Sequence, residues 1–236
     1  MGFDRTVITS YYPLKYGIGY WVIDDLDSIF DFDSLMKEID DCEFLDNRAN
    51  VFNPFRNKFI DSLNGSLLIQ DFIRKFHKEH ISPETTPSFD EFSCWTNHYT
   101  KKRDKMFSEI GLLPHIDHLD DFKQNSIACN LWITEDVEGS GTNLYKYHGE
   151  MRDGMYDFSY DRNHPLFDTY KKLRALPPKT EYINYDWELW GFELLGMAPS
   201  KYKTMTIYKS LVPHNAYIPY EVQIRNSCSF FYETDA

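Results

Sequence analysis

The sequence lacks the patterns that mark secreted, disulfide-stapled and membrane-spanning proteins. Its four cysteines are scattered over 236 residues without a Cys-x-x-Cys pair, so we expect free thiols in a reducing compartment. The first residues show neither the basic nor the apolar region of a signal peptide. No run approaches the roughly 18 apolar residues that a membrane span requires. These absences predict a soluble, cytoplasmic protein with no membrane partner.

Basic residues are also scarce. Lys and Arg number 25 against 37 Asp and Glu, which gives a formal net charge of −12. Such a field repels the phosphates of nucleic acids and anionic membrane surfaces, which argues against a nucleic-acid partner. Apolar residues make up 42% of the chain and aromatic residues 17%, enough for the packed core of one domain over 1–236.

The N-terminal part of the chain carries helical spacing. Two helices are expected, over about 33–41 and 66–78, after a short strand at 20–23. In the second helix the predicted apolar stripe consists of Leu67, Leu68, Phe72, Ile73 and Phe76. We therefore expect a helical support over about 1–90.

Beyond residue 90 the chain becomes a series of short aromatic or β-branched segments separated by turn residues. The predicted strands are 92–100, 126–134, 142–147, 204–208 and 225–232. Helices gathered before such strands favour an α+β fold with a mainly β core, a sandwich or barrel supported by helices.

A long, charged, aromatic-rich stretch interrupts these strands between Lys146 and Lys203, with a predicted helix over 165–176. Connections of this length are usually lids or binding loops. Its aromatic residues either line a substrate cleft or form the apolar side of a packed insertion, and both interpretations stay open. They are Tyr156, Tyr160, Tyr185, Trp187 and Trp190.

Three residues have the chemistry of a metal site. On a strand, His115 and Asp117 point to the same face, so both can hold one ion. His214, which follows the predicted strand 204–208, completes a set of two histidines and one carboxylate. This set suits Fe(II) and leaves coordination positions open for a co-substrate and dioxygen.

Arg225 follows His214 by eleven residues, at the head of a predicted strand. Arg225 and Ser227 share one strand face and can present a guanidinium and a hydroxyl to one carboxylate. The rest of the strand has the composition of an interior segment, so an arginine there requires a bound anion or a buried partner.

These residues, in this order, resemble the prolyl-hydroxylase-like branch of the 2-oxoglutarate/Fe(II)-dependent dioxygenase superfamily. The resemblance rests on His115-x-Asp117, the Gly141-Thr-x-Leu-Tyr145 strand, Ser210-x-x-x-His214 and Arg225. It covers about 90–145 and 204–232 well, and the N-terminal part in outline. The stretch from Lys146 to Lys203 and a single glycine, where a pair is commoner, depart from the pattern.

The resemblance implies a double-stranded β-helix (jelly-roll) core over about 90–236, with an insertion at about 146–203. His115, Asp117 and His214 would bind iron. Arg225, helped by Ser227, would bind 2-oxoglutarate, and a nearby tyrosine or asparagine often assists. The candidates for that assisting role are Asn130, Tyr145 and Tyr208.

The implied reaction consumes dioxygen and 2-oxoglutarate, hydroxylates a C–H bond of a small molecule or of an amino-acid or peptide side chain, and releases succinate and CO2. Ascorbate would be a supporting reductant. A carboxylate at position 117, where halogenating relatives have a small residue, favours hydroxylation.

Three other functions remain to be weighed. A cupin-like non-haem metal protein would use the same three ligands without 2-oxoglutarate, but it has no need of Arg225 and Ser227. A catalytically silent jelly-roll protein would be expected to have lost a ligand. A hydrolytic zinc enzyme could use His115, His118 and a carboxylate, but the sequence contains neither a His-Glu-x-x-His helix nor a similarly specific pattern. The sequence indicates neither the substrate nor the oligomeric state.

Overall fold

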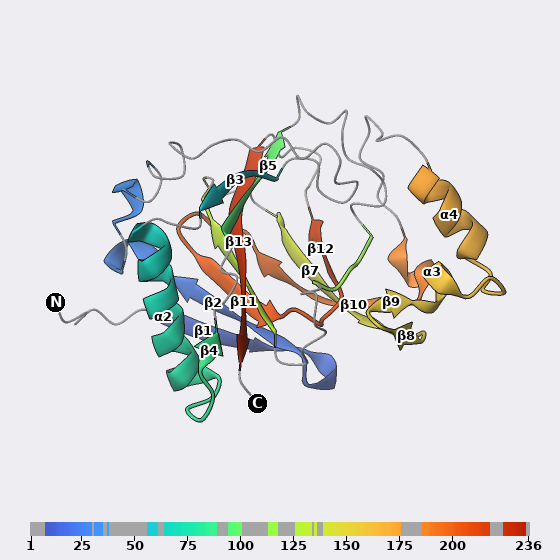
Figure 1. Cartoon of the computed structure of the whole chain (residues 1–236), viewed down its shortest axis with the longest axis horizontal. Coiled ribbons are helices and arrows are strands. Elements are labelled where there is room, and N and C mark those ends of the chain that lie inside the picture. The colour runs from blue at the N-terminus through green and yellow to red at the C-terminus, as the bar shows by residue number, and fades with distance from the viewer. Residues whose placement is uncertain are drawn as a thin grey trace.

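Antiparallel β-sheets dominate the structure, a computed structural model, and helices are few in its described part (Figure 1). The structure describes residues 8–29, 31–34, 37, 56–60, 64–88, 94–100, 113–117, 126–133, 135, 139–175, 186–217 and 224–234. No helix in these ranges is long and apolar enough to cross a membrane.

Within the described ranges the larger sheet has eight strands, in the order β1-β2-β11-β6-β13-β5-β3, with β4 pairing to β13. All the pairs are antiparallel. The strands are β1 (Ile8–Pro13), β2 (Gly19–Asp24), β3 (Arg56–Ile60), β4 (Pro87–Ser88), β5 (Cys94–Thr100), β6 (Ile127–Trp132), β11 (Met205–Lys209) and β13 (Ile224–Thr234).

The smaller sheet contains β10 (Phe192–Pro199), β7 (Gly141–Tyr147) and β12 (His214–Tyr217), in that order. A separate hairpin joins β8 (Met151–Arg152) to β9 (Met155–Tyr156). Its turn residues, Asp153 and Gly154, have φ of 48° and 71°, the left-handed conformation that a two-residue hairpin turn requires.

The helices lie at two ends of the molecule. Figure 1 shows α2 (Asn64–His80) beside the larger sheet and α3 (Asp157–Tyr160) and α4 (Phe167–Ala175) on the opposite side. Three short 3₁₀ segments also lie in the described ranges: η1 (Lys15–Gly17), η2 (Leu26–Ser28) and η5 (Trp187–Trp190).

Strand alternation divides the side chains of the larger sheet between two cores. Met205 and Ile207 of β11 face α2, in a core that includes the buried Ile69, Ile73 and Phe76 of that helix. Burying each such side chain is worth roughly 1.5–3 kcal/mol.

The opposite face of the larger sheet packs against the smaller sheet. Tyr208 and Ala128 share a core with Leu144 and Ala198 of the smaller sheet, and the Tyr20 hydroxyl donates to the Met197 carbonyl at 3.1 Å. Side chains of both sheets therefore fill the space between them.

A third core covers the outer face of the smaller sheet. We call it the aromatic layer, and it consists of Leu113, Tyr145, Tyr147, Tyr156, Phe158, Tyr170, Trp187, Trp190 and Phe192. Most of its residues come from the stretch after Lys146, so this stretch packs as a layer on the sheet.

The predicted mainly β core is confirmed, with strands at all five predicted segments after residue 90 and helices at α2 and α4. Before residue 90 the described ranges contain the predicted strand, as β2, and the unpredicted strands β1, β3 and β4 beside α2. One expectation was wrong. Leu67 and Leu68 are 59% and 45% exposed, whereas Ile69 is buried, because the buried stripe of α2 begins one turn before Ile73.

The structure also contains strands that the sequence pattern did not predict. β10 pairs with β7 along its length, so the stretch between Lys146 and Lys203 returns to the smaller sheet at Phe192. The described residues of the first predicted helix, 33, 34 and 37, are helical, and its remainder lies outside the described ranges.

Candidate metal centre

Backbone pairing brings the two histidines together. His115 and His214 form an isolated antiparallel bridge, with N–H···O distances of 2.9 Å from His115 to His214 and 2.8 Å in return. On its other edge His214 pairs with Leu144 of β7. The segment 113–117 therefore lies beside β12, at the margin of the smaller sheet.

A second backbone contact positions the carboxylate. The amide of Asp117 donates to the carbonyl of Ser210 at 3.1 Å, and the Ser210 hydroxyl lies 2.8 Å from that of Ser126. Ser210 follows β11 and Ser126 precedes β6, so the larger sheet anchors Asp117 while the smaller sheet anchors His214.

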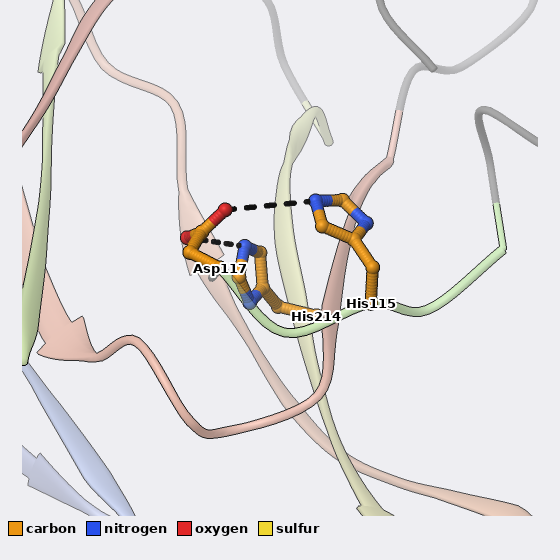
Figure 2. A group of neighbouring side chains, drawn as sticks. All are labelled: His115, Asp117 and His214. Carbon is orange, nitrogen blue, oxygen red and sulfur yellow. Dashed lines mark ion pairs between the residues drawn. The ribbon is translucent and has the colours of Figure 1, made fainter. Parts of the chain in front are cut away.

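The three side chains converge on one point (Figure 2). A carboxylate oxygen of Asp117 and one ring nitrogen from each histidine all lie within 4.8 Å of one another. His214 Nε2 is 3.1 Å from Asp117 Oδ2, and His115 Nε2 is 3.9 Å from Asp117 Oδ1. In the described part of the chain this is the group that could hold a metal ion.

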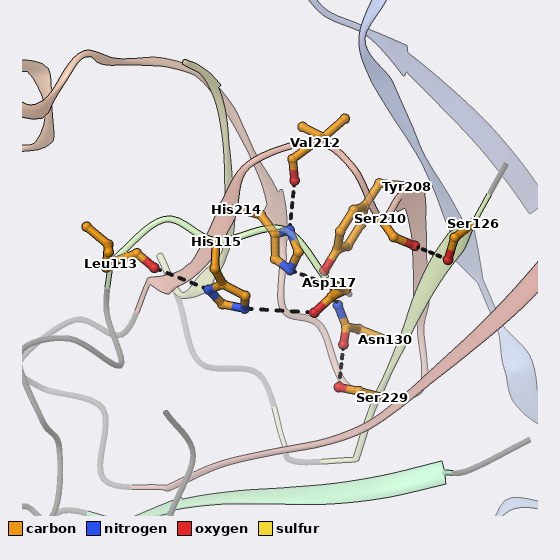
Figure 3. A network of polar contacts seen from close by, with 10 residues as sticks. All are labelled: Leu113, His115, Asp117, Ser126, Asn130, Tyr208, Ser210, Val212, His214 and Ser229. Carbon is orange, nitrogen blue, oxygen red and sulfur yellow. Dashed lines mark hydrogen bonds and ion pairs between the residues drawn. The ribbon is translucent and has the colours of Figure 1, made fainter. Parts of the chain in front are cut away.

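The hydrogen bonds of the imidazoles leave the correct atoms for a metal. His115 Nδ1 lies 3.2 Å from the Leu113 carbonyl, and His214 Nδ1 lies 2.8 Å from the Val212 carbonyl (Figure 3). A carbonyl only accepts, so each Nδ1 carries the proton and each Nε2 is directed to the cluster. Metal-binding histidines are oriented by carbonyls in this way.

Burial differs sharply within the cluster. The side chains of His214 and Asp117 are 6% and 14% exposed, whereas that of His115 is 47% exposed. Burial lowers the pKa of His214, but the Asp117 carboxylate and the Val212 carbonyl outweigh it and raise the pKa above its usual value. Asp117 therefore favours a positive charge at this position, which a metal ion can supply instead of a proton.

Tyr208 lies against the cluster, and Asn130 lies beside Tyr208. The ring of Tyr208 packs edge-on against His214 at 5.0 Å between centroids. The side-chain amide of Asn130 donates to the Tyr208 hydroxyl at 3.0 Å, and the Ser229 hydroxyl donates to Oδ1 of Asn130 at 2.6 Å. Sequence reasoning missed Ser229, although it lies two residues from Ser227 and therefore shares its strand face.

Tyr145 is not brought to the cluster. It neighbours Leu144 on β7 and points to the opposite face, into the aromatic layer. Its hydroxyl accepts from Asn143 at 3.1 Å and donates to Asn215 at 3.2 Å. Its predicted role with the co-substrate gains no support from this position.

Arg225 and Ser227 are residues of β13. In the sheet, Arg225 pairs with Tyr99 of β5, and Ser227 pairs with Trp132 of β6. Ser227 is buried. The side chain of Arg225 and all of His118 lie outside the described part of the structure.

The aromatic residues after Lys146 favour the packed alternative. Tyr156, Trp187 and Trp190 are buried in the aromatic layer, Tyr160 is half-buried, and Tyr185 lies outside the described ranges.

Comparison with known proteins gives a family and several solved structures. The sequence model of a family of unknown function, DUF6445, matches residues 17–228. No curated protein matches the sequence.

The similar solved structures include HygX from Streptomyces hygroscopicus with nickel, 2-oxoglutarate and hygromycin B bound (11% identity, 92% of this chain and 83% of that chain covered, TM-score 0.46). Others are an N-substituted L-amino acid dioxygenase from Burkholderia ambifaria (11%, 92% and 86%, 0.45) and a Pseudomonas putida prolyl-4-hydroxylase (10%, 96% and 79%, 0.37). These values are too low to transfer an activity or a ligand to this chain.

Proposed function

Because the chain belongs to the DUF6445 family, whose function is unknown, we propose a function from the site itself. The protein is an Fe(II)- and 2-oxoglutarate-dependent oxygenase that hydroxylates a C–H bond of a small molecule or an amino-acid side chain. The observation that carries this proposal is the convergence of His115, Asp117 and His214.

The donor set fits iron. Two imidazole Nε2 atoms and one carboxylate form the set of ligands that non-haem Fe(II) oxygenases use, and three ligands on one side leave the other positions open. A structural zinc site would be closed by a fourth ligand. The described residues supply three, and the half-exposed His115 marks the side on which co-substrate and substrate can approach.

The inner face of the larger sheet fits an organic acid. Asn130, Tyr208 and Ser229 form a hydrogen-bonded polar strip beside His214. Strand alternation puts Arg225 in phase with Ser227 and Ser229, so its guanidinium is expected on this same face. There it would bind the far carboxylate of 2-oxoglutarate, at the centre of a jelly-roll formed by the two packed sheets.

The protein's own part in the reaction is to bind and to orient. Bound iron and 2-oxoglutarate would supply the oxidising chemistry. Burial of Asp117 and His214 limits the access of water from their side. The net charge of −12 favours a neutral or cationic substrate over a nucleic acid. Cys129 and Cys228, which are buried and form no disulfide with each other, suit a reducing compartment such as the cytoplasm.

The test is an anaerobic titration of the Fe(II)-loaded protein with 2-oxoglutarate, following the visible metal-to-ligand charge-transfer band. We expect the band in the wild type and its loss in His214→Ala. An iron-loaded, folded wild type without the band would contradict the proposal and favour a cupin-like metal protein that does not use 2-oxoglutarate.

A further inference from the structure

Asn130 lies between two hydroxyl-bearing neighbours on the inner face of the larger sheet. In the strand register it is opposite Thr206 of β11 on one side and opposite Ser229 of β13 on the other. The Ser229 hydroxyl bonds to Oδ1 of Asn130, whereas the fully buried Thr206 hydroxyl has no hydrogen-bond partner in the described part of the chain. Ser229 therefore holds the Asn130 amide, and Thr206 does not.

The distances give this chain of hydrogen bonds a direction. Ser229 Oγ lies 2.6 Å from Oδ1 of Asn130, and Nδ2 of Asn130 lies 3.0 Å from the Tyr208 hydroxyl. The shorter distance is typical of an O–H···O bond and the longer of an N–H···O bond, which agrees with the oxygen of the amide facing Ser229 and its nitrogen facing Tyr208. Ser229 therefore donates to Asn130, and Asn130 donates to Tyr208.

This direction makes Tyr208 a hydrogen-bond donor beside the metal ligands. A phenol carries one proton and can also accept, and because the Tyr208 oxygen accepts from Asn130, its proton is directed to another group. Figure 3 shows Ser229 at the end of the chain farther from His214, with Asn130 next to Tyr208. The ring of Tyr208 packs against His214. An Asn130 amide turned the other way would take the Tyr208 proton for itself.

We propose that Ser229 is a positioning residue of the co-substrate site. It fixes the Asn130 amide so that the Tyr208 hydroxyl donates to a carboxylate oxygen of the organic acid bound at the metal centre. The inference rests on the proposed function, in which that acid is 2-oxoglutarate. It gives the polar strip a selectivity, because an ionised carboxylate accepts hydrogen bonds and donates none.

The experiment is a calorimetric titration of the Co²⁺-loaded protein with 2-oxoglutarate, Co²⁺ being a stand-in for Fe(II). In Ser229→Ala the 2-oxoglutarate affinity should fall roughly 10-fold or more, the effect of losing one hydrogen bond to a charged group, while the Co²⁺ affinity stays unchanged. Ser229→Thr keeps the hydroxyl and should restore the 2-oxoglutarate affinity. Thr206→Val is the matched control: it removes the other hydroxyl beside Asn130 and should bind 2-oxoglutarate as the wild type does.

A double-mutant cycle separates positioning from a general structural effect. In Tyr208→Phe no phenol proton remains to be directed, so adding Ser229→Ala should weaken 2-oxoglutarate binding no further. An equal further loss in that background would overturn the inference. So would an unchanged 2-oxoglutarate affinity in Ser229→Ala, or a loss of Co²⁺ affinity as large as the loss for 2-oxoglutarate. A wild type that binds Co²⁺ but not 2-oxoglutarate would instead overturn the proposed function, and this inference with it.

Discussion

At the scale of single residues, the two histidines are held by one local device. Each imidazole donates Nδ1–H to the carbonyl two residues before it, Leu113 for His115 and Val212 for His214. The ring orientation therefore comes from the ligand's own segment, and the two Nε2 atoms are preorganised before a metal arrives. Arg225 lies on β13 rather than on either histidine segment, so its proposed role can be tested separately from metal binding.

Arg225→Ala should weaken 2-oxoglutarate binding and leave metal binding intact. Removing one member of a buried, hydrogen-bonded charge pair costs about 2 kcal/mol or more, which is roughly a 30-fold loss of affinity. The measurement is the charge-transfer titration with 2-oxoglutarate, beside a Co²⁺ titration. Arg225→Lys keeps the charge but not the forked guanidinium, so its 2-oxoglutarate affinity should lie between those of the wild type and Arg225→Ala. Equal loss of metal and 2-oxoglutarate binding would show that Arg225 is structural.

At the scale of elements, α2 supports the face of the larger sheet that lies opposite the metal centre. Ile69, Ile73 and Phe76 pack into the core shared with β11 and β13, while Leu67 and Leu68 face solvent. The helix therefore stabilises the strands that carry Asn130 and Tyr208 without touching the site.

Ile73→Ala should destabilise the fold by about 2–5 kcal/mol, because it leaves a cavity under α2. Leu68→Ala, on the exposed side of the same helix, should change the free energy of unfolding by less than about 0.5 kcal/mol. Urea unfolding measures both. An equal loss of unfolding free energy in the two variants would mean that α2 does not pack as described.

α2 also carries a buried histidine that links stability to pH. His77 is fully buried, with Nδ1 3.1 Å from the Tyr232 hydroxyl of β13 and Nε2 2.7 Å from the Thr85 hydroxyl. Burial lowers the pKa of His77 below its usual value. The folded protein therefore binds the proton less readily than the unfolded chain, and stability falls as the pH drops through about 6.5, the unfolded value.

His77→Gln, which keeps a hydrogen-bonding side chain but cannot titrate, should reduce this loss. The measurement is the free energy of unfolding in urea at pH 7.5 and at pH 5. We expect the wild type to lose more stability than the variant between these two values. The same loss in both would assign the pH dependence to other groups.

At the scale of the whole molecule, the sequence predicted the three side chains that converge, His115, Asp117 and His214, better than the structure around them. His115 and Asp117 form a local i, i+2 pattern, and His214 directly follows a strongly apolar strand, so neighbouring residues define them. The faces that Tyr145 and Tyr156 occupy could not be predicted: Tyr145 lies on a sheet that is covered on both faces, and Tyr156 lies on a separate hairpin that packs in the aromatic layer. Their faces depend on which distant segments pack there.

The failure to predict β1 and β10 from the sequence has the same cause. β1 shows no buried face, and a register shift between Leu194 and Gly196 breaks the alternation of β10. Neither strand carries the periodic signal on which a prediction from sequence depends, and each is defined by its partner, β2 or β7.

The metal centre links segments that the fold anchors separately, so metal binding should stabilise the whole molecule. Asp117 is held by the end of β11 and His214 by β7, and an ion bound to both ties the two sheets. At a free concentration of about 100 times Kd, a bound ion adds about 2.7 kcal/mol, which raises Tm by roughly 5–10 °C in a chain of this size. Thermal unfolding with Co²⁺ and with a chelator measures the difference. It should vanish in His214→Ala and persist in His148→Ala, whose imidazole pairs with Glu193 instead. A shift that survives in His214→Ala would place the metal elsewhere.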